Sequence, residues 1–152
     1  IQDGADWVYV ENSEVRYDYT GIRENSNGWW RIENGRVNFG FTGLASNENG
    51  RFYIQDGRVN FDYTDIIQDG ADWVYVENSE VRYDYTGIRE NINGWWRIEN
   101  GRVDFGFTGI ASNENGEFYI KDGNVRFDYN GLYQYKKITY IICNGLVIDK
   151  LV

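Results

Sequence analysis

Seven valines stand 22 residues apart along this chain: Val15, Val37, Val59, Val81, Val103, Val125 and Val147. A longer period lies over the first one, because residues 1–66 and 67–132 are identical at 56 of 66 aligned positions. Self-similarity at a short fixed period is typical of tandem repeat proteins, in which each unit packs mainly on its neighbours. The chain is therefore expected to fold as successive copies of one small unit.

The unit itself is predicted to be a β-hairpin. Asn34-Gly35 stands between two runs of alternating apolar residues. A type I′ turn requires positive φ at both central residues, and Asn and Gly adopt positive φ most readily, so this pair favours that turn. A two-residue turn there places Ile32 opposite Val37, Trp30 opposite Phe39, and Trp29 opposite Gly40. The same signal recurs at Asp56-Gly57, Asn100-Gly101, Asp122-Gly123 and Asn144-Gly145, and in weaker form at Asn12-Ser13 and Asn78-Ser79.

A single hairpin of this length cannot stand alone, since burying about six apolar side chains does not offset the entropy lost on ordering the whole unit. The sequence therefore predicts an all-β fold, a solenoid or stacked array of seven tandem 22-residue β-hairpin repeats. We expect six repeats in residues 1–132, arranged as two triplets (1–66 and 67–132), and a degenerate capping repeat in residues 133–152. Two interpretations of the 66-residue period stay open: one structural turn of three repeats, or a duplicated segment.

Period-two alternation separates two faces of each hairpin. The expected core face carries Val8/Val10, Trp30/Ile32, Phe52/Ile54, Val74/Val76, Trp96/Ile98 and Phe118/Ile120, with return-strand partners such as Tyr17, Phe39, Phe41 and Phe61. Ile22, Leu44 and their equivalents are expected to anchor the connecting loops. The expected outward face, which differs from copy to copy, carries Trp7, Tyr9, Trp29, Arg31, Tyr53, Trp73, Tyr75, Trp95, Arg97 and Tyr119.

Composition excludes most catalytic chemistry. The chain has no His, no Met, no Pro and one Cys, so a His-based triad, a His-ligated metal site and an internal disulfide are all absent by counting. We accordingly expect no enzyme activity, no catalytic residue, no metal and no cofactor. The net charge of −9 argues against nucleic acid as a partner, and no apolar run is long enough to span a membrane.

The outward aromatics can be interpreted in two ways. Flat rings stack on sugars, and paired rings hold a quaternary ammonium group by cation–π attraction, while repetition adds avidity for a polymer. The same rings could instead protect a sheet surface by packing against cross-strand neighbours, without any ligand.

The unit Gly28-Trp29-Trp30-x-Ile32-x-Asn34-Gly35-x-Val37-x-Phe39-x-Phe41-Thr42-Gly43 resembles the aromatic-rich cell-wall-binding repeats of Gram-positive bacteria. That group includes choline-binding and glucan-binding modules and the repetitive tails of clostridial toxins. The resemblance covers residues 1 to about 132. It implies an extracellular, non-enzymatic module that binds wall polymers in clefts between repeats. Choline-binding repeats carry an aromatic residue after Thr-Gly, whereas this chain has Ile22, Leu44, Ile88 and Ile110 there, which argues against a choline site.

The predicted function is therefore a non-catalytic, extracellular, cell-wall-associated repeat module that binds cell-wall polymer or carbohydrate through the ten outward residues above. Its expected partners are a cell-wall glycan or teichoic-acid-like polymer, or a surface protein. End-to-end self-association is a further expectation, because the stacking faces of the repeats are nearly identical. The alternative hypothesis is a structural spacer or adhesin stalk without a ligand of its own.

Overall fold

The computed structural model describes residues 1–151, so Val152 of the expected cap lies outside the described residues. All regular structure in this range is β-strand, which confirms the expected all-β array of hairpins. Contacts divide the chain into two compact units: Ile1–Thr64 with Val76–Val81, and Asp65–Tyr75 with Arg82–Val152. The expected division into two triplets and a cap stays a prediction.

The strands of the N-terminal part are short and regularly spaced: β1 (Gln2–Asp3), β2 (Asp6–Trp7), β3 (Val10–Glu11), β4 (Glu14–Val15), β5 (Gly21–Asn25), β6 (Gly28–Glu33), β7 (Arg36–Val37), β8 (Gly43–Asn47), β9 (Gly50–Gln55) and β10 (Arg58–Val59). The pattern then continues: β11 (Asp65–Asp69), β12 (Asp72–Glu77), β13 (Glu80–Val81), β14 (Gly87–Asn91), β15 (Gly94–Glu99), β16 (Arg102–Val103), β17 (Gly109–Asn113), β18 (Gly116–Lys121), β19 (Asn124–Val125), β20 (Gly131–Tyr135), β21 (Ile138–Cys143) and β22 (Leu146–Leu151).

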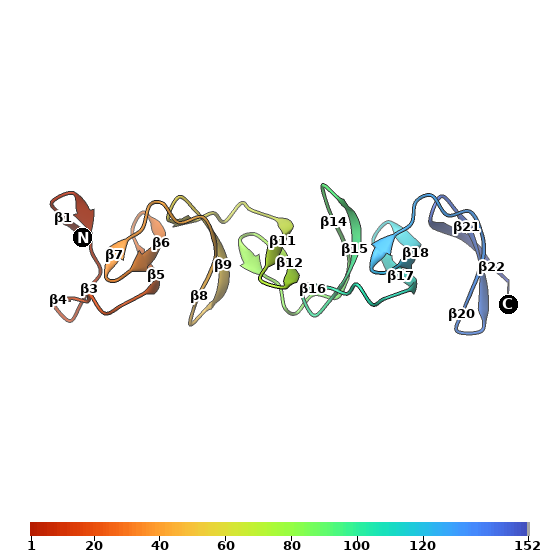
Figure 1. Cartoon of the computed structure of the whole chain (residues 1–152), viewed down its shortest axis with the longest axis horizontal. Coiled ribbons are helices and arrows are strands. Elements are labelled where there is room, and N and C mark those ends of the chain that lie inside the picture. Colours follow the sequence, from red (N-terminus) through yellow and green to blue (C-terminus); the bar gives the residue numbers. More distant parts are fainter. Residues whose placement is uncertain (152) are drawn as a thin grey trace. The chain divides into compact units, whose positions relative to one another are not determined.

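The main hairpin of a repeat lies one strand earlier than the sequence predicted. Strands β5 and β6 pair from Gly21↔Ile32 to Asn25↔Gly28, around a two-residue turn (Figure 1). Residues 21–25 were expected to be a connecting loop that Ile22 anchors, which is wrong. Ile22 is instead a fully buried strand residue, and Ile88 occupies the same place in the second unit.

The Asn34-Gly35 turn forms as expected, but the strand after it is short. Asn34 has φ 49° and Gly35 has φ 78°, and Ile32 pairs with Val37, so the predicted register is confirmed up to that point. Beyond Val37 the predicted pairing of Trp30 with Phe39 and of Trp29 with Gly40 is wrong. The Asn38 side chain accepts a hydrogen bond from Gly40 N at 2.9 Å, and Phe41 N donates to Asn38 O at 3.3 Å, so the chain turns away there.

The turn glycines join each repeat to the one before it. Gly35 N donates to Tyr19 O at 2.8 Å, and Gly35 O accepts from Tyr9 N at 2.8 Å. A Cβ on Gly35 would lie 2.6 Å from Arg16 O, so the close approach requires glycine as much as the positive φ does. Gly57 in the first unit and Gly101, Gly123 and Gly145 in the second make the same pair of bonds.

Because neighbouring repeats approach this closely, both faces of a hairpin are covered. In the first unit Ile22 packs with Ala45, Phe52 and Ile54 of the next repeat, and Trp29 packs against this cluster. The buried residues Val8, Phe52, Val74 and Phe118 confirm part of the predicted core face. The column expected opposite them is not core, since Tyr17, Phe39, Phe61, Tyr83, Phe105 and Phe127 are 40–50% exposed.

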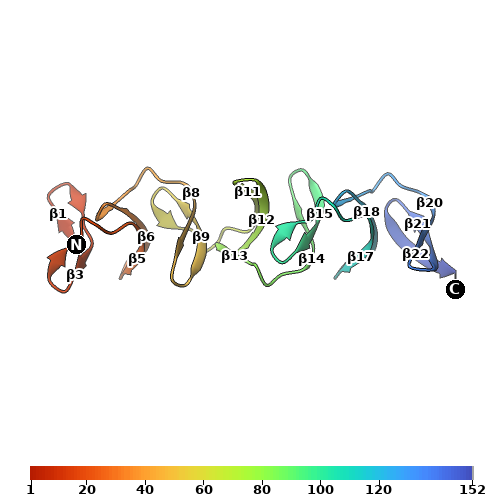
Figure 2. The ribbon, with the colours of Figure 1, turned by 60° about the horizontal axis from the view of Figure 1, so that its bottom comes forward.

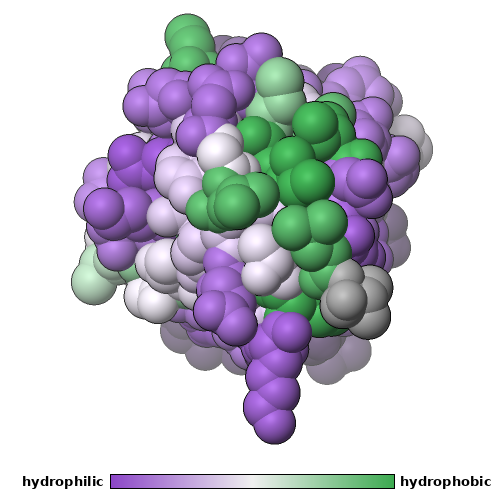
Figure 3. Space-filling view, turned by 90° about the vertical axis from the view of Figure 1, so that its right-hand side faces the viewer, coloured by the Kyte–Doolittle hydropathy of each residue, from purple (hydrophilic) through white to green (hydrophobic). Residues whose placement is uncertain are grey.

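The last repeat is a three-stranded sheet of β20, β21 and β22, which lie side by side in Figure 2. At this C-terminal end of the second unit several apolar side chains are exposed, and Figure 3 shows apolar residues gathered on the end face. The exposed residues of these strands are Leu132, Leu146, Ile148 and Leu151.

Candidate functional site: two aromatic pockets

Each unit holds an open pocket walled by aromatic rings, and these two pockets correspond to each other. The first pocket, in the first unit, has a volume of about 450 Å³ and is lined by Trp7, Asn25, Asn27, Trp30, Val37, Phe39 and Arg58. The second pocket, in the second unit, has a volume of about 360 Å³ and is lined by Ile66, Trp73, Asn91, Asn93, Trp96, Val103 and Phe105. Six of the seven lining residues in each pocket form identical pairs related by the 66-residue period, and only Arg58 and Ile66 have no counterpart in the lining of the other pocket. Volumes of this size suit a small ligand group.

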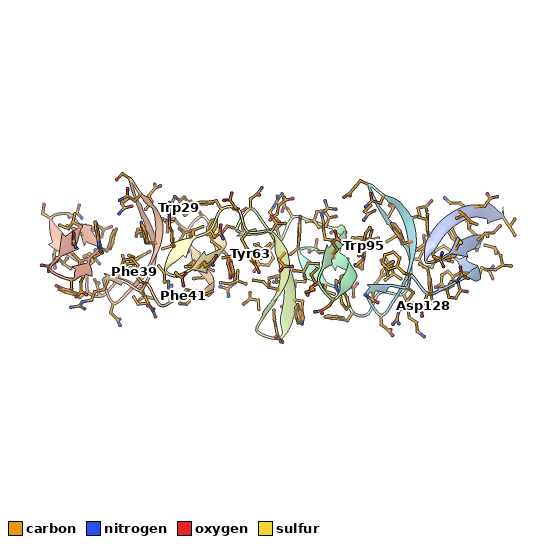
Figure 4. The ribbon with its side chains drawn as sticks, turned by 90° about the horizontal axis from the view of Figure 1, so that it is seen from above. Trp29, Phe39, Phe41, Tyr63, Trp95 and Asp128 are labelled. Atoms are coloured by element: carbon orange, nitrogen blue, oxygen red, sulfur yellow. The ribbon has the colours of Figure 1, made fainter. Side chains whose placement is uncertain are left out.

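Three consecutive repeats line the first pocket, and Arg58 of β10 belongs to the third of them. Trp7 comes from β2 of one repeat, and Trp30 comes from β6 of the next. Phe39 follows β7 and stands half-exposed where the chain turns away; its ring centroid lies 5.8 Å from that of Trp30 in an edge-to-face arrangement. Figure 4 labels Phe39, together with Trp29 of the adjacent core. Because β7 ends at Val37, the Phe39 ring does not pair across the sheet and can line the pocket.

Hydrogen bonds within the hairpin hold the tryptophan rings in place. Trp30 Nε1 donates to Asn25 Oδ1 at 2.9 Å, and Asn27 N donates to the same oxygen at 2.9 Å. In the second pocket Trp96 Nε1 donates to Asn91 Oδ1 at 3.0 Å, and Trp96 and Phe105 meet edge-to-face at 5.8 Å. Because the indole N–H groups are used internally, the rings offer their faces rather than their edges to a ligand.

The repeat that follows each pocket along the chain carries a closed aromatic cluster instead. Trp29 is the counterpart of Trp7, and Phe52 and Phe61 are the counterparts of Trp30 and Phe39. There the Trp29 ring lies 5.3 Å from Phe52 and 5.6 Å from Phe61, and Phe52 is only 4% exposed. Trp95 packs on Phe118 and Phe127 in the same way in the second unit. An open pocket therefore coincides with tryptophan at the position of Trp30 and Trp96.

The expected division of the paired tryptophans into one outward and one core residue is wrong, since all four are half-buried. Trp29 and Trp95 pack against core clusters. Trp30 and Trp96, which were expected to be core, line the pockets, and Trp96 also packs against the cluster of Ile66, Tyr75 and Ile98. Of the ten predicted binding residues, Trp7 and Trp73 line the two pockets. Trp7 thus shares a pocket with Trp30, and Trp73 shares one with Trp96, although Trp30 and Trp96 were expected to be core residues.

Most of the other predicted binding residues pack against other side chains of the protein. Tyr75 and Tyr119 were expected to point outward, which is wrong, since they are 3% and 8% exposed. Burial also raises the pKa of Tyr119. Tyr53 stacks on Tyr63 with ring centroids 3.7 Å apart. Arg31 and Arg97 lie over the rings of Phe41 and Phe107, each at 4.9 Å, so these guanidinium groups already occupy an aromatic face.

Tyr9 belongs to a smaller, more polar cavity of about 220 Å³ that also touches Trp29. Arg23 fills the aromatic faces there, with its Cζ 4.4 Å from the Tyr19 ring centroid, and it pairs with Glu48 at 2.8 Å. A hydrogen bond from its own backbone and then the bond from Arg23 hold the pKa of the Glu48 carboxyl below its usual value. The guanidinium group of Arg23 thus already occupies the aromatic face that a cationic ligand would need in this cavity.

Sequence reasoning missed Trp30, Asn25 and Arg58, and their counterparts Trp96 and Asn91. A signal for the tryptophans was present, because their position alternates between Val, Trp and Phe in the first six repeats and so varies as much as the positions that were expected to face outward. No such signal marked Asn25 or Asn91, since Asn is common in turns.

No group of three or more His, Cys, Asp and Glu side chains in residues 1–151 is placed to hold a metal ion. The same range contains no helix long and apolar enough to cross a membrane. Glu117, a carboxylate in a repeat that also carries Asp128, forms an ion pair with Lys150 at 3.0 Å.

Comparison with known families gives one match. A sequence profile described as a choline-binding repeat matches residues 18–38, 40–60, 62–79, 84–104 and 106–125, which together make up more than half of the chain. No curated protein sequence matches the chain.

Among solved structures, the chain is similar to CbpJ from Streptococcus pneumoniae TIGR4, with 19% sequence identity and a TM-score of 0.40 over 97% of this chain and 51% of that one. Choline binding protein F from Streptococcus pneumoniae, solved in the presence of a peptidoglycan analogue (tetrasaccharide-pentapeptide), gives 16% identity and a TM-score of 0.38 over 97% and 50%. Crystal form II of that protein gives 17% and 0.37 with the same coverage. The chain spans about half the length of these structures.

Proposed function

Because the chain belongs to the choline-binding repeat family, we propose that it is a non-catalytic module that binds quaternary ammonium groups, such as choline, carried by a cell-wall polymer. The observation that carries this proposal is the pair of aromatic pockets, which recur at equivalent places in the two units. In the second pocket the binding residues are Trp73, Trp96 and Phe105, with Asn91 as the residue that positions Trp96.

The second pocket suits a ligand that needs ring faces more than hydrogen bonds. Asn91 is engaged at both ends of its amide: Oδ1 accepts from Trp96 Nε1 and Asn93 N, and Nδ2 donates to Ile66 O at 3.2 Å. A sugar held there would lack these polar partners for its hydroxyl groups. A trimethylammonium group requires none, because it binds aromatic faces by cation–π attraction.

Charge favours the same class of ligand. The chain carries a net charge of −9, so its overall field attracts cations and repels anions. Expected partners are therefore wall polymers of the teichoic-acid type in which cationic groups are displayed, and the proposed location is the outside of a Gram-positive cell. Ile22 and Leu44, which stand where choline-binding repeats carry an aromatic residue, are compatible with choline, because Phe39 and Phe105 supply the third ring of the two pockets.

Affinity chromatography tests the proposal. The protein should be retained on choline-agarose and eluted by free choline, whereas sodium chloride at the same ionic strength should leave most of it bound. Cell walls that contain choline should retain the protein, and walls grown without choline should not. Elution by a soluble glucan instead of choline would favour a carbohydrate ligand and contradict the proposal.

The alternative hypothesis is a spacer or stalk that displays another domain. The observation in its favour is that most aromatic side chains pack on one another or on arginines rather than facing solvent. Failure of the parent protein to bind choline-agarose and cell walls of either kind would support the spacer.

A further inference from the structure

The two pockets are nearly identical in sequence, yet they differ in charge. Residue 58 in the first unit corresponds to residue 124 in the second, and this is one of the few positions where the 66-residue copies disagree, with Arg58 in one and Asn124 in the other. Both residues pair across the sheet with the pocket tryptophan: Arg58 with Trp30, and Asn124 with Trp96. The substitution therefore lies beside the ring that is central to each pocket.

Arg58 lies over the tryptophan of the first pocket. Its Cζ is 5.6 Å from the centroid of the Trp30 ring, and the guanidinium group lines the pocket. A Cβ placed on Gly28 would come within 2.7 Å of Arg58 Nε, which shows how closely the side chain follows β6. Within residues 1–151, no carboxylate lies within ion-pair distance of Arg58; Asp56 and Asp62 line a neighbouring cavity with it, so no direct partner neutralises the guanidinium group at the pocket.

Asn124 leaves the second pocket without a fixed cation. Its Nδ2 donates to Trp95 O at 3.2 Å, so the amide is held against the backbone of β15. No arginine or lysine is among the residues that line the second pocket. The face of Trp96 is consequently available to a cation from solution.

Two effects then oppose a cationic ligand in the first pocket. The guanidinium occupies an aromatic face that a quaternary ammonium group would use. In addition, two like charges a few ångströms apart near a protein surface repel strongly enough to weaken binding by well over tenfold.

We propose that Arg58 is a specificity-determining residue that excludes quaternary ammonium ligands from the first pocket, so that choline binds in the second pocket and not in the first. This inference rests on the proposed function of the pockets. It makes the near-duplicate halves of the chain unequal: the chain carries two aromatic pockets, but a single one accepts an organic cation.

Isothermal titration with choline chloride tests the inference through stoichiometry. The parent protein should bind one choline per chain. Arg58→Asn gives the first pocket the residue that its counterpart already carries, so the variant should fold and bind two. Asn124→Arg makes the second pocket resemble the first, and its affinity for choline should fall by more than tenfold.

The matched control is Arg36→Asn, which removes the same charge from an arginine that pairs with Asp6 and does not line either pocket. It should keep the stoichiometry of the parent. Two cholines bound by the parent, one bound by Arg58→Asn, or two bound by Arg36→Asn would each overturn the inference and leave the proposed function standing. If none of the four proteins binds choline, the proposed function itself fails.

Discussion

Replacing Trp96 by phenylalanine should close the second pocket without unfolding the protein. Phenylalanine occupies the same position of the repeat at Phe52 and Phe118, where each ring is 4% exposed and packs edge-to-face on a tryptophan of the preceding repeat. In the variant Trp96→Phe, the ring should pack against Trp73 in the same manner. The pocket would then resemble the closed clusters around Trp29 and Trp95.

The expected loss follows from the contacts that disappear. The indole face of Trp96 is one of three aromatic surfaces in the pocket, and its N–H bond to Asn91, which fixes the orientation of the ring, is lost as well. A cation–π contact at a partly desolvated site contributes about 1 to 2 kcal/mol. The lost contact alone should therefore lower choline affinity by about 5- to 30-fold, and closure of the pocket should lower it further.

The assay is isothermal titration of choline into the parent, Trp96→Phe and the matched control Trp95→Phe. Trp95 is the adjacent residue of the same strand, but its ring packs on Phe118 and Phe127 and does not line the pocket. Trp95→Phe should keep the parent affinity, although it loses some stability. Thermal unfolding followed by circular dichroism checks that both variants are folded.

The opposite pattern would refute the reasoning. Had the face assignment made from sequence alone been right, Trp95→Phe would lose choline affinity and Trp96→Phe would mainly lose stability. Equal affinities for all three proteins would show that neither tryptophan contacts the ligand.

Two further predictions concern stability. Gly57→Ala should destabilise the protein by well over ~1 kcal/mol, since a Cβ in a left-handed conformation would lie 2.6 Å from Asn38 O. Gly4→Ala, which shares the positive φ but has no atom within 4 Å, should cost less; equal losses in chemical denaturation would contradict the role assigned to the close approach. A hydrogen bond from the residue's own backbone, and then one from Arg23 or Arg89, lowers the pKa of Glu48 and of Glu114, so these contacts stabilise the fold above about pH 4.5 and are lost as the pH falls through the lowered pKa values. Replacing both by glutamine should therefore flatten the fall in melting temperature on acidification, and an unchanged profile would count against the two pairs.

The sequence predicted the repeat and its turn because both depend on local chemistry. The 22-residue period and the positive φ required at Asn34 and Gly35 are properties of the chain itself, and the pairing of Ile32 with Val37 follows from them. The return strand was overestimated because Val37-Asn38-Phe39-Gly40-Phe41 alternates as a strand does. The bond from Gly40 N to the Asn38 side chain ends the pairing, and alternation alone does not reveal it.

The binding face could not be predicted from one hairpin. An isolated hairpin has one core face and one solvent-exposed face, whereas a repeat packed between two other repeats has neighbours on both of its faces. Trp29 is covered in this way by Phe52 of the next repeat, and Tyr75, expected outside, is buried against Ile66 and Ile98. The two pockets exist where tryptophan rather than phenylalanine meets the preceding repeat, and this depends on side-chain size across a junction. The expected end-to-end self-association stays a prediction.

A crystal structure of the protein with choline tests the central claim most directly. The account predicts the trimethylammonium group among the rings of Trp73, Trp96 and Phe105, with no choline over Trp30 beside Arg58. Choline bound instead against Trp29 or Trp95, or absent from the second pocket at a concentration that saturates the protein in solution, would contradict it.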